Sequence, residues 1–210
     1  MKYQQIIFDI DGTLIDTEYA VLHSLQDTLK TLCNKGVPPE ELTFALGITS
    51  EDALKRFPVE NMSAAVDLWN ENEARYKDTI TMFAGIPEAL EALSRLGCEM
   101  GIITSKTREE YENSFVHFGI CQYFKTVICA DDTTEHKPTP VPILKYMELT
   151  GSERARTLYV GDSKYDAMCA RAAGVDFGLA VWGSHTESME ADYYFRQPSE
   201  IVAAVKKDSQ

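Results

Sequence analysis

Residues 6–13 read IIFDIDGT, and this stretch decides how the rest of the chain is interpreted. An apolar, β-branched run gives way to a turn where Asp9 and Asp11 stand on either side of Ile10. Alternate side chains of a strand point the same way, so the two carboxylates share one face at the strand end. Two such charges about 5 Å apart repel by roughly 3 kcal/mol at an effective dielectric constant near 20. The stretch therefore predicts a positive charge close to both carboxylates.

Five further segments resemble the run at residues 4–9: they are short, mostly rich in Ile and Val, and bounded by turn-forming residues. Helical periodicity fills the gaps between them; at residues 87–97, for example, Leu90 and Leu93 recur at helical spacing before Gly97 ends the pattern. Alternation of strand and helix predicts a parallel sheet with helices on both faces, an α/β fold. The six strand-like segments are QQIIFD (4–9), EMGIIT (99–104), KTVICA (125–130), TLYVGD (157–162), FGLAVW (177–182) and ADYYF (191–195).

One long stretch, from about Glu18 to about Ile80, contains no convincing strand. Its first helix-like run, at residues 19–33, places four apolar side chains on one face: Val21, Leu25, Leu29 and Leu32. Such a stripe is typical of core packing. We therefore expect an all-helical insertion after the first strand.

Composition limits the classes of partner. The 210 residues are 44% hydrophobic and 25% charged, which is typical of a globular protein. The formal net charge of −13 opposes nonspecific binding to nucleic acid or anionic lipid, because both require clustered Lys and Arg. No apolar run has the roughly 18 residues of a membrane span, and the N-terminus does not resemble a secretory signal. We expect a cytoplasmic protein without nucleic-acid or membrane partners.

Polar residues follow the strand-like segments at the edge where an open parallel sheet binds its ligands. Carboxylate oxygens suit Mg²⁺, while a lysine and a hydroxyl suit a phosphate group. The set therefore predicts a hard-cation site that faces a phosphate. Its members are Asp9 and Asp11, then Thr104, Ser105 and Lys106, then Lys137, and finally Asp162 and Asp166.

Each of these residues also has an ordinary structural explanation. Asp11 can belong to a turn, because Asp-Gly is a strong turn signal. Thr104 can be the N-cap of the helix that follows, although Thr107 is better placed for that role and forms a capping box with Glu110. Asp162 and Asp166 flank a helix start, where acidic residues are favourable. Their joint occurrence at the ends of several strands favours the site.

Four motifs in this order resemble those of the haloacid dehalogenase superfamily: FDIDGTLIDTE (8–18), GIITSKT (101–107), HKPTP (136–140) and YVGDSKYD (159–166). The likeness covers nearly the whole chain and is most specific in the first and fourth motifs. It points to the branch of Mg²⁺-dependent phosphatases with a helical cap. The fold it implies is a Rossmann-like three-layer core of residues 1–15 and 82–210, with a helical cap at residues 16–81.

The resemblance also implies roles for the strand-end residues. Asp9 corresponds to a nucleophile that forms an aspartyl-phosphate, and Asp11 to the general acid and base. Thr104 and Lys137 correspond to the groups that bind the transferring phosphoryl oxygens.

The metal site follows from the same likeness. Mg²⁺ is expected to bind the Asp9 carboxylate, the Asp11 backbone carbonyl and Asp162, with Asp166 reaching it through water or orienting its ligands. This ion would relieve the repulsion between the strand-end carboxylates and allow an anionic nucleophile to approach a phosphate.

Other activities of the superfamily remain as alternatives. Asp11 argues against a dehalogenase, because halide leaves without a proton. Sugar-phosphate mutases usually carry a His in the first cap helix and an Arg in the cap loop. Counting along the motifs places Val21 and Ser50 there, although His23 lies nearby.

A phosphonate-cleaving enzyme would need a Schiff-base lysine from the cap, and Lys30, Lys35 and Lys55 are the candidates. Outside these enzymes, a phosphoacceptor signalling domain or a silent binding protein of the same fold is the alternative. The presence of every motif residue favours an enzyme over both.

The substrate is expected to be a small phosphate monoester. The cap loop FALGITSEDALKRF (44–57) offers Thr49 and Ser50 as candidate substrate contacts, together with Glu51, Lys55 and Arg56; an ordinary helix start with Ser50 as N-cap is the alternative. The loop has no dense cationic cluster for a second phosphate. The overall pattern is most similar to phosphoglycolate phosphatases, with pyrophosphatases and nucleotidases as alternatives. Hinges are expected at residues 15–17 and 79–85.

Overall fold

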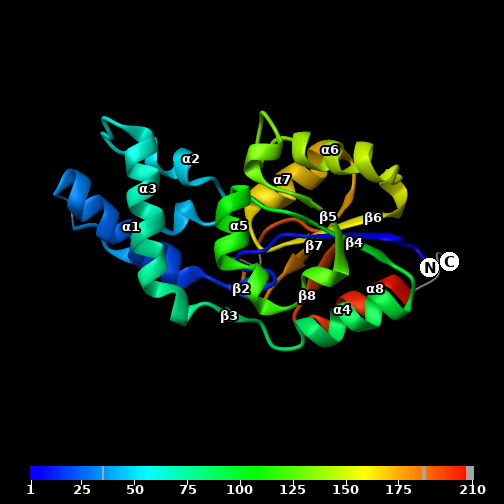
Figure 1. Ribbon diagram of the computed structural model, residues 1–210. Helices are drawn as coiled ribbons and strands as arrows, with labels where there is room; N and C mark the ends of the chain where they lie inside the picture. Colours follow the sequence, from blue (N-terminus) through cyan, green and yellow to red (C-terminus); the bar gives the residue numbers. More distant parts are fainter. Residues whose placement is uncertain (35, 186–187, 207–210) are drawn as a thin grey trace.

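A six-stranded parallel sheet forms the centre of the computed structural model, which describes residues 1–34, 36–185 and 188–206 (Figure 1). The strand order is β5-β4-β1-β6-β7-β8, and every neighbouring pair is parallel. Each of the six segments expected to be strands overlaps one of these strands, which confirms the α/β fold. Their bounds are β1 Gln5–Phe8, β4 Glu99–Ile103, β5 Phe124–Ile128, β6 Thr157–Gly161, β7 Asp176–Ala180 and β8 Tyr193–Phe195.

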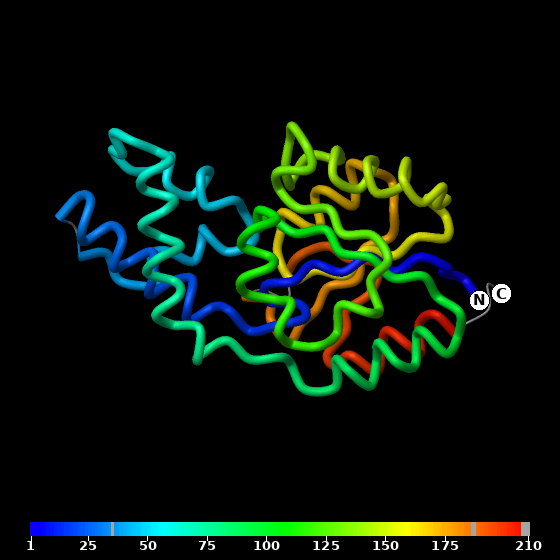
Figure 2. Tube along the Cα trace, in the orientation of Figure 1, coloured from blue at the N-terminus to red at the C-terminus, as the bar shows by residue number. Residues whose placement is uncertain are grey.

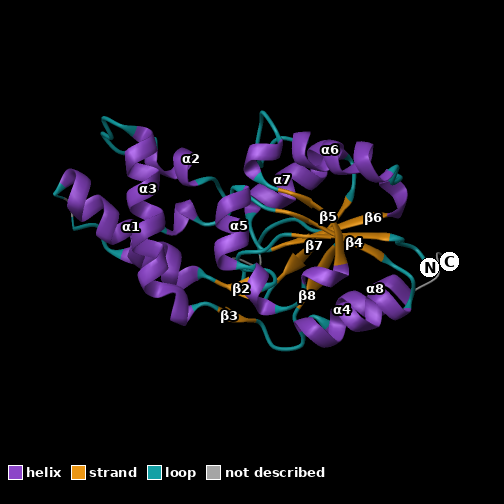
Figure 3. Ribbon diagram, viewed as in Figure 1, coloured by secondary structure: helices purple, strands orange, loops and turns teal. Residues whose placement is uncertain are grey.

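Helices cover both faces of the sheet (Figure 3). One apolar cluster joins β1 residues Ile6 and Phe8 to α4 (Ile86–Arg95), α5 (Arg108–Ser114) and α8 (Ser199–Lys206). A second cluster joins Ile7, on the opposite face of the same strand, to α6 (Val141–Thr150) and α7 (Lys164–Ala173). Because successive side chains of β1 enter opposite clusters, the strand is buried from both sides and its sequence is continuously apolar.

The order in which the chain adds strands to the sheet reverses beside β1. From β1 the chain builds outward through β4 and β5, then crosses back to β6 and builds the other half through β7 and β8. Asp9 directly follows β1, and Asp162 directly follows the neighbouring strand β6. Ligands of open α/β sheets bind at this kind of switch point, so the topology brings the first and fourth motifs together.

The segment after β1 is a tight loop in which the Ile10 carbonyl accepts hydrogen bonds from the backbone N–H groups of residues 13, 14 and 15. Gly12 lies in the left-handed region at φ 74°, and a Cβ there would approach Asp162 Oδ2 to 2.3 Å. Only glycine fits both conditions. The loop leads into β2 (Ile15–Asp16), which pairs antiparallel with β3 (Thr81–Met82).

The segment between β2 and β3 lies to one side of the sheet, and its two connections to the rest of the chain run side by side (Figure 2). The regular structure of residues 18–34 and 36–80 is helical throughout, as expected. Its α-helices are α1 (Glu18–Cys33), α2 (Ser50–Leu54) and α3 (Met62–Glu73). An apolar cluster of its own includes Leu25, Leu54 and Trp69.

The expected apolar face of α1 is partly wrong. Leu25 and Leu29 are fully buried, but the Leu32 residue is 40% exposed. Ser24 and Thr28 are buried in the same face because their hydroxyls hydrogen-bond to side chains of α3. Polar residues thus occupy positions that an apolar stripe would not assign to the core.

Short 3₁₀ helices complete the regular structure of the described residues: η1 Pro39–Glu41, η2 Thr43–Ala45, η3 Ala74–Thr79, η4 Val116–Phe118, η5 Cys121–Tyr123, η6 Ala130–Asp132 and η7 Arg154–Arg156. Within the described residues, no helix has the length and apolar character needed to span a membrane.

Candidate active site

Three carboxylates from the first and fourth motifs meet at the switch point of the sheet. Asp9, Asp162 and Asp166 each place an oxygen within 4.8 Å of the others. All three residues are buried, with exposed fractions of 2%, 7% and 0%. Burying one unpaired carboxylate is already unfavourable, so a cluster of three requires cationic partners.

Lys137 supplies one of these partners. Its ammonium lies 3.0 Å from Asp9 Oδ1 and 2.8 Å from Asp166 Oδ1, and the residue is only 3% exposed. Lys137, from a loop more than a hundred residues away in the sequence, therefore supplies part of the positive charge predicted beside Asp9. One ammonium among three carboxylates still leaves the cluster short of two positive charges.

The pKa values reflect this deficit. Burial raises the pKa of Asp9 to about 7; Lys137 opposes the shift, whereas Asp166 and Asp11 add to it. Burial, followed by repulsion from Asp166 and Asp9, raises the pKa of Asp162 well above its ordinary value. Burial alone would lower the pKa of Lys137, but the carboxylates of Asp166 and Asp9 outweigh it and raise that pKa. The cluster therefore favours any additional cation that can enter it.

Asp166 has its oxygens occupied by protein donors. Oδ1 accepts hydrogen bonds from Lys137 Nζ and the Tyr159 hydroxyl, both at 2.8 Å. Oδ2 accepts from the Ser163 N–H at 3.0 Å and the Ser163 hydroxyl at 2.6 Å, within the capping box of α7. This carboxylate is therefore suited to holding Lys137 in place.

Asp9 and Asp162 provide the donors for a metal ion. Carboxylate oxygens are the ligands preferred by hard divalent cations, and the missing charge of the cluster equals that of one such ion. Asp162 Oδ1 also accepts a hydrogen bond from the Thr13 hydroxyl at 3.2 Å, which orients it. The residues present thus fit Mg²⁺.

A second ionic cluster lies beside the first. The Lys106 ammonium is 3.3 Å from Asp11 Oδ1 and 3.4 Å from Glu73 Oε1, and the residue is 8% exposed. Burial alone would lower the pKa of Lys106, but Asp11, Glu73 and Glu110 outweigh it and raise that pKa. Asp11 Oδ1 forms no well-directed hydrogen bond with any side chain of the described residues. Asp11 therefore lies between Lys106 and the cavity that it lines.

The sequence places Lys106 among the strand-end residues but assigns it no catalytic or binding role, and it gives no signal for Glu73. Lys106 lies two residues after Thr104, a position that could have suggested it. Glu73 ends α3, inside the strandless stretch and far in sequence from the strand ends. Its meeting with Lys106 depends on how the helical segment packs against the sheet.

A cavity of about 200 Å³ lies between the two parts of the chain. Core residues that line it include Asp9, Asp11, Ser105, Lys106 and Asp162. Residues of the helical segment on its wall include Val21, Gly47, Ser50, Trp69 and Glu73, and the loop after β7 adds Trp182 and His185. The cavity is therefore large enough for a small ligand that contacts Asp9 and the helical segment together.

Not every predicted site residue lines this cavity. Thr104 and Lys137 are 4% and 3% exposed and lie outside its lining. The Thr104 hydroxyl accepts a hydrogen bond from the Lys106 N–H at 3.1 Å. Ser105, in contrast, reaches the cavity and donates to the Gly47 carbonyl at 3.0 Å.

The cap loop differs from expectation at its helix start. Thr49, not Ser50, is the N-cap of α2, and its hydroxyl accepts from the Asp52 N–H at 3.2 Å. Its side chain is engaged there, and Thr49 is outside the cavity lining. Ser50 lines the cavity and donates to Glu110 Oε1 at 3.4 Å.

The other polar side chains predicted for this loop face elsewhere. Lys55 pairs with Asp52 at 2.9 Å and Glu51 at 3.3 Å on the surface. The Arg56 guanidinium lies 4.0 Å from the centre of the Phe44 ring. The loop contributes residues 45–48 and Ser50 to the cavity lining.

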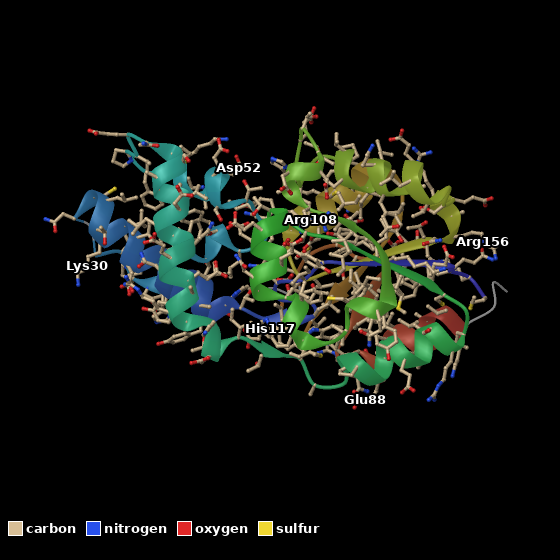
Figure 4. The ribbon with its side chains drawn as sticks, viewed as in Figure 1. Lys30, Asp52, Glu88, Arg108, His117 and Arg156 are labelled. Atoms are coloured by element: carbon tan, nitrogen blue, oxygen red, sulfur yellow. The ribbon has the colours of Figure 1, made fainter. Side chains whose placement is uncertain are left out.

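The structure also bears on the alternative activities. Val21 and Ser50 both line the cavity, so the positions counted for a mutase are there but carry no cation. Lys30 lies far from the sheet on α1 (Figure 4), and neither it nor Lys55 lines the cavity. Lys35 lies outside the described residues.

Comparison with known proteins places this arrangement in a family. The model of the haloacid dehalogenase-like hydrolases matches residues 6–180. A phosphoglycolate phosphatase of Aquifex aeolicus is 31% identical over 94% of both chains. The pyrophosphatase PpaX of Halalkalibacterium halodurans is 27% identical over 98% of both.

Among solved structures, a Lactobacillus plantarum protein provisionally named a phosphoglycolate phosphatase superposes with a TM-score of 0.88. It is 30% identical, and the match covers 97% of this chain and 99% of that one. The family match and the full-length structural likeness are both consistent with the buried carboxylate cluster at the switch point. The chain belongs to the haloacid dehalogenase-like hydrolases and is a phosphatase of that superfamily.

Proposed function

We propose that this protein is a Mg²⁺-dependent phosphomonoester hydrolase that acts on a small phosphorylated metabolite through an aspartyl-phosphate on Asp9. The observation that carries the proposal is the buried Asp9 carboxylate at the switch point, beside Lys137 and Asp162 and open to the cavity. The arrangement joins a nucleophile, cationic stabilisation and space for a small substrate at one place.

Asp9 attacks the phosphorus atom of the bound ester and displaces the alcohol oxygen. Lys137 stays beside Asp9 and stabilises charge on the transferring phosphoryl group. Thr104 is proposed as the second group that binds its oxygens. Asp166, held by Tyr159 and Ser163, keeps Lys137 in that position. Mg²⁺, held by Asp9, the Asp11 carbonyl and Asp162, supplies charge neutralisation at the phosphoryl oxygens when bound.

Asp11 donates a proton to the departing alcohol and then accepts one from the water that hydrolyses the aspartyl-phosphate. Asp11 lines the cavity and its side chain is 20% exposed, so its carboxylate can bind the leaving oxygen. Lys106, 3.3 Å away, holds the carboxylate toward the cavity.

Residues 16–81 are proposed as a cap over a core formed by residues 1–15 and 82–210. The separate apolar cluster of the helical segment and the paired connections at β2 and β3 support this division. Ser105, Ser50 and the backbone near Gly47 are the candidate contacts for the substrate. Closure of the cap would exclude bulk water from the cavity during transfer.

Pyrophosphate hydrolysis is the second candidate, because relatives named PpaX match almost the whole chain. The proposed monoesterase is favoured because the described lining of the cavity lacks the cationic cluster that a second phosphate would need. Mutase activity is disfavoured by Val21 and Ser50. A phosphoacceptor or silent binding protein would need neither a substrate cavity nor Asp11 as a general acid.

The test is release of alcohol from an aryl phosphate with and without Mg²⁺. We expect Mg²⁺-dependent turnover in the wild type and a loss of at least about 10³-fold in Asp9→Asn, because the variant lacks the nucleophile. Asp131→Asn removes an exposed carboxylate outside the cavity and should keep wild-type activity. Full activity in Asp9→Asn would refute the proposal.

A further inference from the structure

We propose that Glu73 makes the cavity select against leaving groups that carry negative charge, so that the preferred substrates are phosphate esters of neutral or cationic small alcohols. The inference rests on the proposed monoesterase function and adds the class of alcohol to it. It concerns the part of the cavity that receives the alcohol portion of the substrate.

The geometry of phosphoryl transfer decides which groups meet the alcohol. The attacking and leaving oxygens lie roughly in line, so the alcohol points away from Asp9. Besides the switch-point residues, Lys106 and residues of the helical segment line the cavity. Four carboxylates besides the switch-point cluster and Asp11 also line it: Asp16, Glu18, Glu73 and Glu110.

The lysine and the histidine of the described lining, Lys106 and His185, both lie beside carboxylates. The Lys106 ammonium is shared between Asp11 Oδ1 at 3.3 Å and Glu73 Oε1 at 3.4 Å. His185 Nε2 lies 3.4 Å from Glu18 Oε2. An anionic alcohol would have to displace a carboxylate from one of these partners and would still face the others. A neutral or cationic alcohol meets no such opposition.

Glu73 is the residue on which this selection depends most. Its side chain is 18% exposed, and its ion-pair partner among the described residues is Lys106. Glu110 differs, because it also accepts the Thr107 N–H at 2.7 Å as part of the capping box of α5. Removing the charge of Glu73 leaves Asp11 as the ion-pair partner of Lys106 among the described residues, so Lys106 attracts an anionic leaving group more strongly. The α5 capping box stays intact.

Three esters of similar size and different charge test the proposal: phosphoglycolate, 2-hydroxyethyl phosphate and O-phosphoethanolamine. With the wild type we expect kcat/KM for phosphoglycolate to lie at least about tenfold below that for each of the other two. Each compound is also measured as a competitive inhibitor of aryl phosphate hydrolysis, which ranks its binding without requiring turnover.

Glu73→Gln should narrow the difference between phosphoglycolate and 2-hydroxyethyl phosphate by about tenfold or more, because Lys106 loses one competing carboxylate. Glu71→Gln is the matched control: Glu71 is exposed, lies two residues earlier on α3 and is absent from the cavity lining. It changes the net charge equally and should leave the ratio unchanged. A general loss of folding would lower all three rates without changing their ratio.

Raising the KCl concentration in wild-type assays gives a second test that needs no variant. Screening should narrow the difference between the anionic and neutral esters. Phosphoglycolate used or bound by the wild type as well as 2-hydroxyethyl phosphate would overturn the inference, while Mg²⁺-dependent aryl phosphate turnover would leave the proposed function standing. An equal change of ratio in Glu71→Gln would also overturn the role of Glu73. Absence of aryl phosphate turnover would overturn both.

Discussion

Asp176 links the N-terminal residues to β7, outside the cavity. Burial opposes its charge, but hydrogen bonds from Lys2 at 2.8 Å and from Tyr3 outweigh burial and lower its pKa. A carboxyl with a lowered folded-state pKa stabilises the protein above its unfolded value near 3.9, and this contribution is lost as the pH falls through the folded value. Asp176 therefore contributes at neutral pH.

Asp176→Asn should lower the free energy of unfolding at pH 7 by no more than about 1 kcal/mol, because the Asp176 side chain is 38% exposed and solvent screens the pair. The difference from the wild type should shrink as the pH falls below about 4. Urea unfolding at pH 7 and pH 3 measures both. A difference that grows toward pH 3 would contradict the assignment.

Single residues of the site were predictable where the sequence fixes their place at a strand end. Asp9 and Asp162 follow apolar segments directly, so their meeting follows from the order of a parallel sheet. Glu73 was not predictable, because it comes from a helix whose packing against the core has no signature in the sequence. Thr49 was assigned to the substrate because a hydroxyl in a loop has the same sequence signal whether it caps a helix or binds a ligand.

At the scale of elements, the helix pair α1 and α3 depends on buried hydrogen bonds. Trp69 Nε1 donates to the Ser24 hydroxyl at 2.8 Å, and the Asn72 amide donates to the Thr28 hydroxyl at 2.9 Å. A buried donor that loses its partner costs roughly 1–3 kcal/mol. Ser24→Ala leaves the Trp69 N–H unpaired and should lower the free energy of unfolding by that amount.

Urea unfolding followed by far-UV circular dichroism measures the change. Thr31→Ala is the control, because the Thr31 hydroxyl bonds its own helix on the exposed side of α1. It should shift stability by less than about 0.5 kcal/mol. If Ser24→Ala were as small in effect as the control, the inter-helix hydrogen bond would be unimportant for stability.

Elements with a strong local signal were predicted well. The capping box of Thr107 and Glu110 is present at α5, and α4 ends before Gly97 at φ 79°. The strands β2 and β3 were missed, because two residues are too few to show alternation. The buried face of α1 was partly misassigned, because its serine and threonine are buried by hydrogen bonds that only the packed helices reveal.

At the scale of the whole molecule, the account requires that Mg²⁺ binds the folded chain between Asp9 and Asp162. A ligand that binds only the folded state stabilises it by mass action, by about 2.7 kcal/mol at a hundredfold excess over Kd. Adding Mg²⁺ to the metal-free protein should therefore raise Tm, and Asp162→Asn should abolish most of the rise.

Glu71→Gln provides the control for this measurement, because it removes an exposed carboxylate outside the cavity. Its Tm should rise with Mg²⁺ as in the wild type. An equal rise in Asp162→Asn would place the ion elsewhere on this acidic chain.

The arrangement of the two parts was predictable only in outline. A strandless stretch after β1 indicated an inserted helical segment, and the composition of that stretch was sufficient to predict it. Its position over the sheet depends on close contacts such as Gly47, where a Cβ would lie 2.7 Å from the Ser163 hydroxyl. Such contacts join residues that are far apart in the sequence and have no local pattern.

Phosphorylation of Asp9 during turnover can be detected by trapping the phosphorylated protein. Asp11→Asn, which lacks the base for hydrolysis, is mixed with aryl phosphate and Mg²⁺, quenched in acid and digested for peptide mass spectrometry. The account predicts a phosphoryl group on Asp9, absent when Asp9 is also changed to Asn. A phosphoryl group on another residue, or wild-type turnover without any labelled peptide, would contradict it.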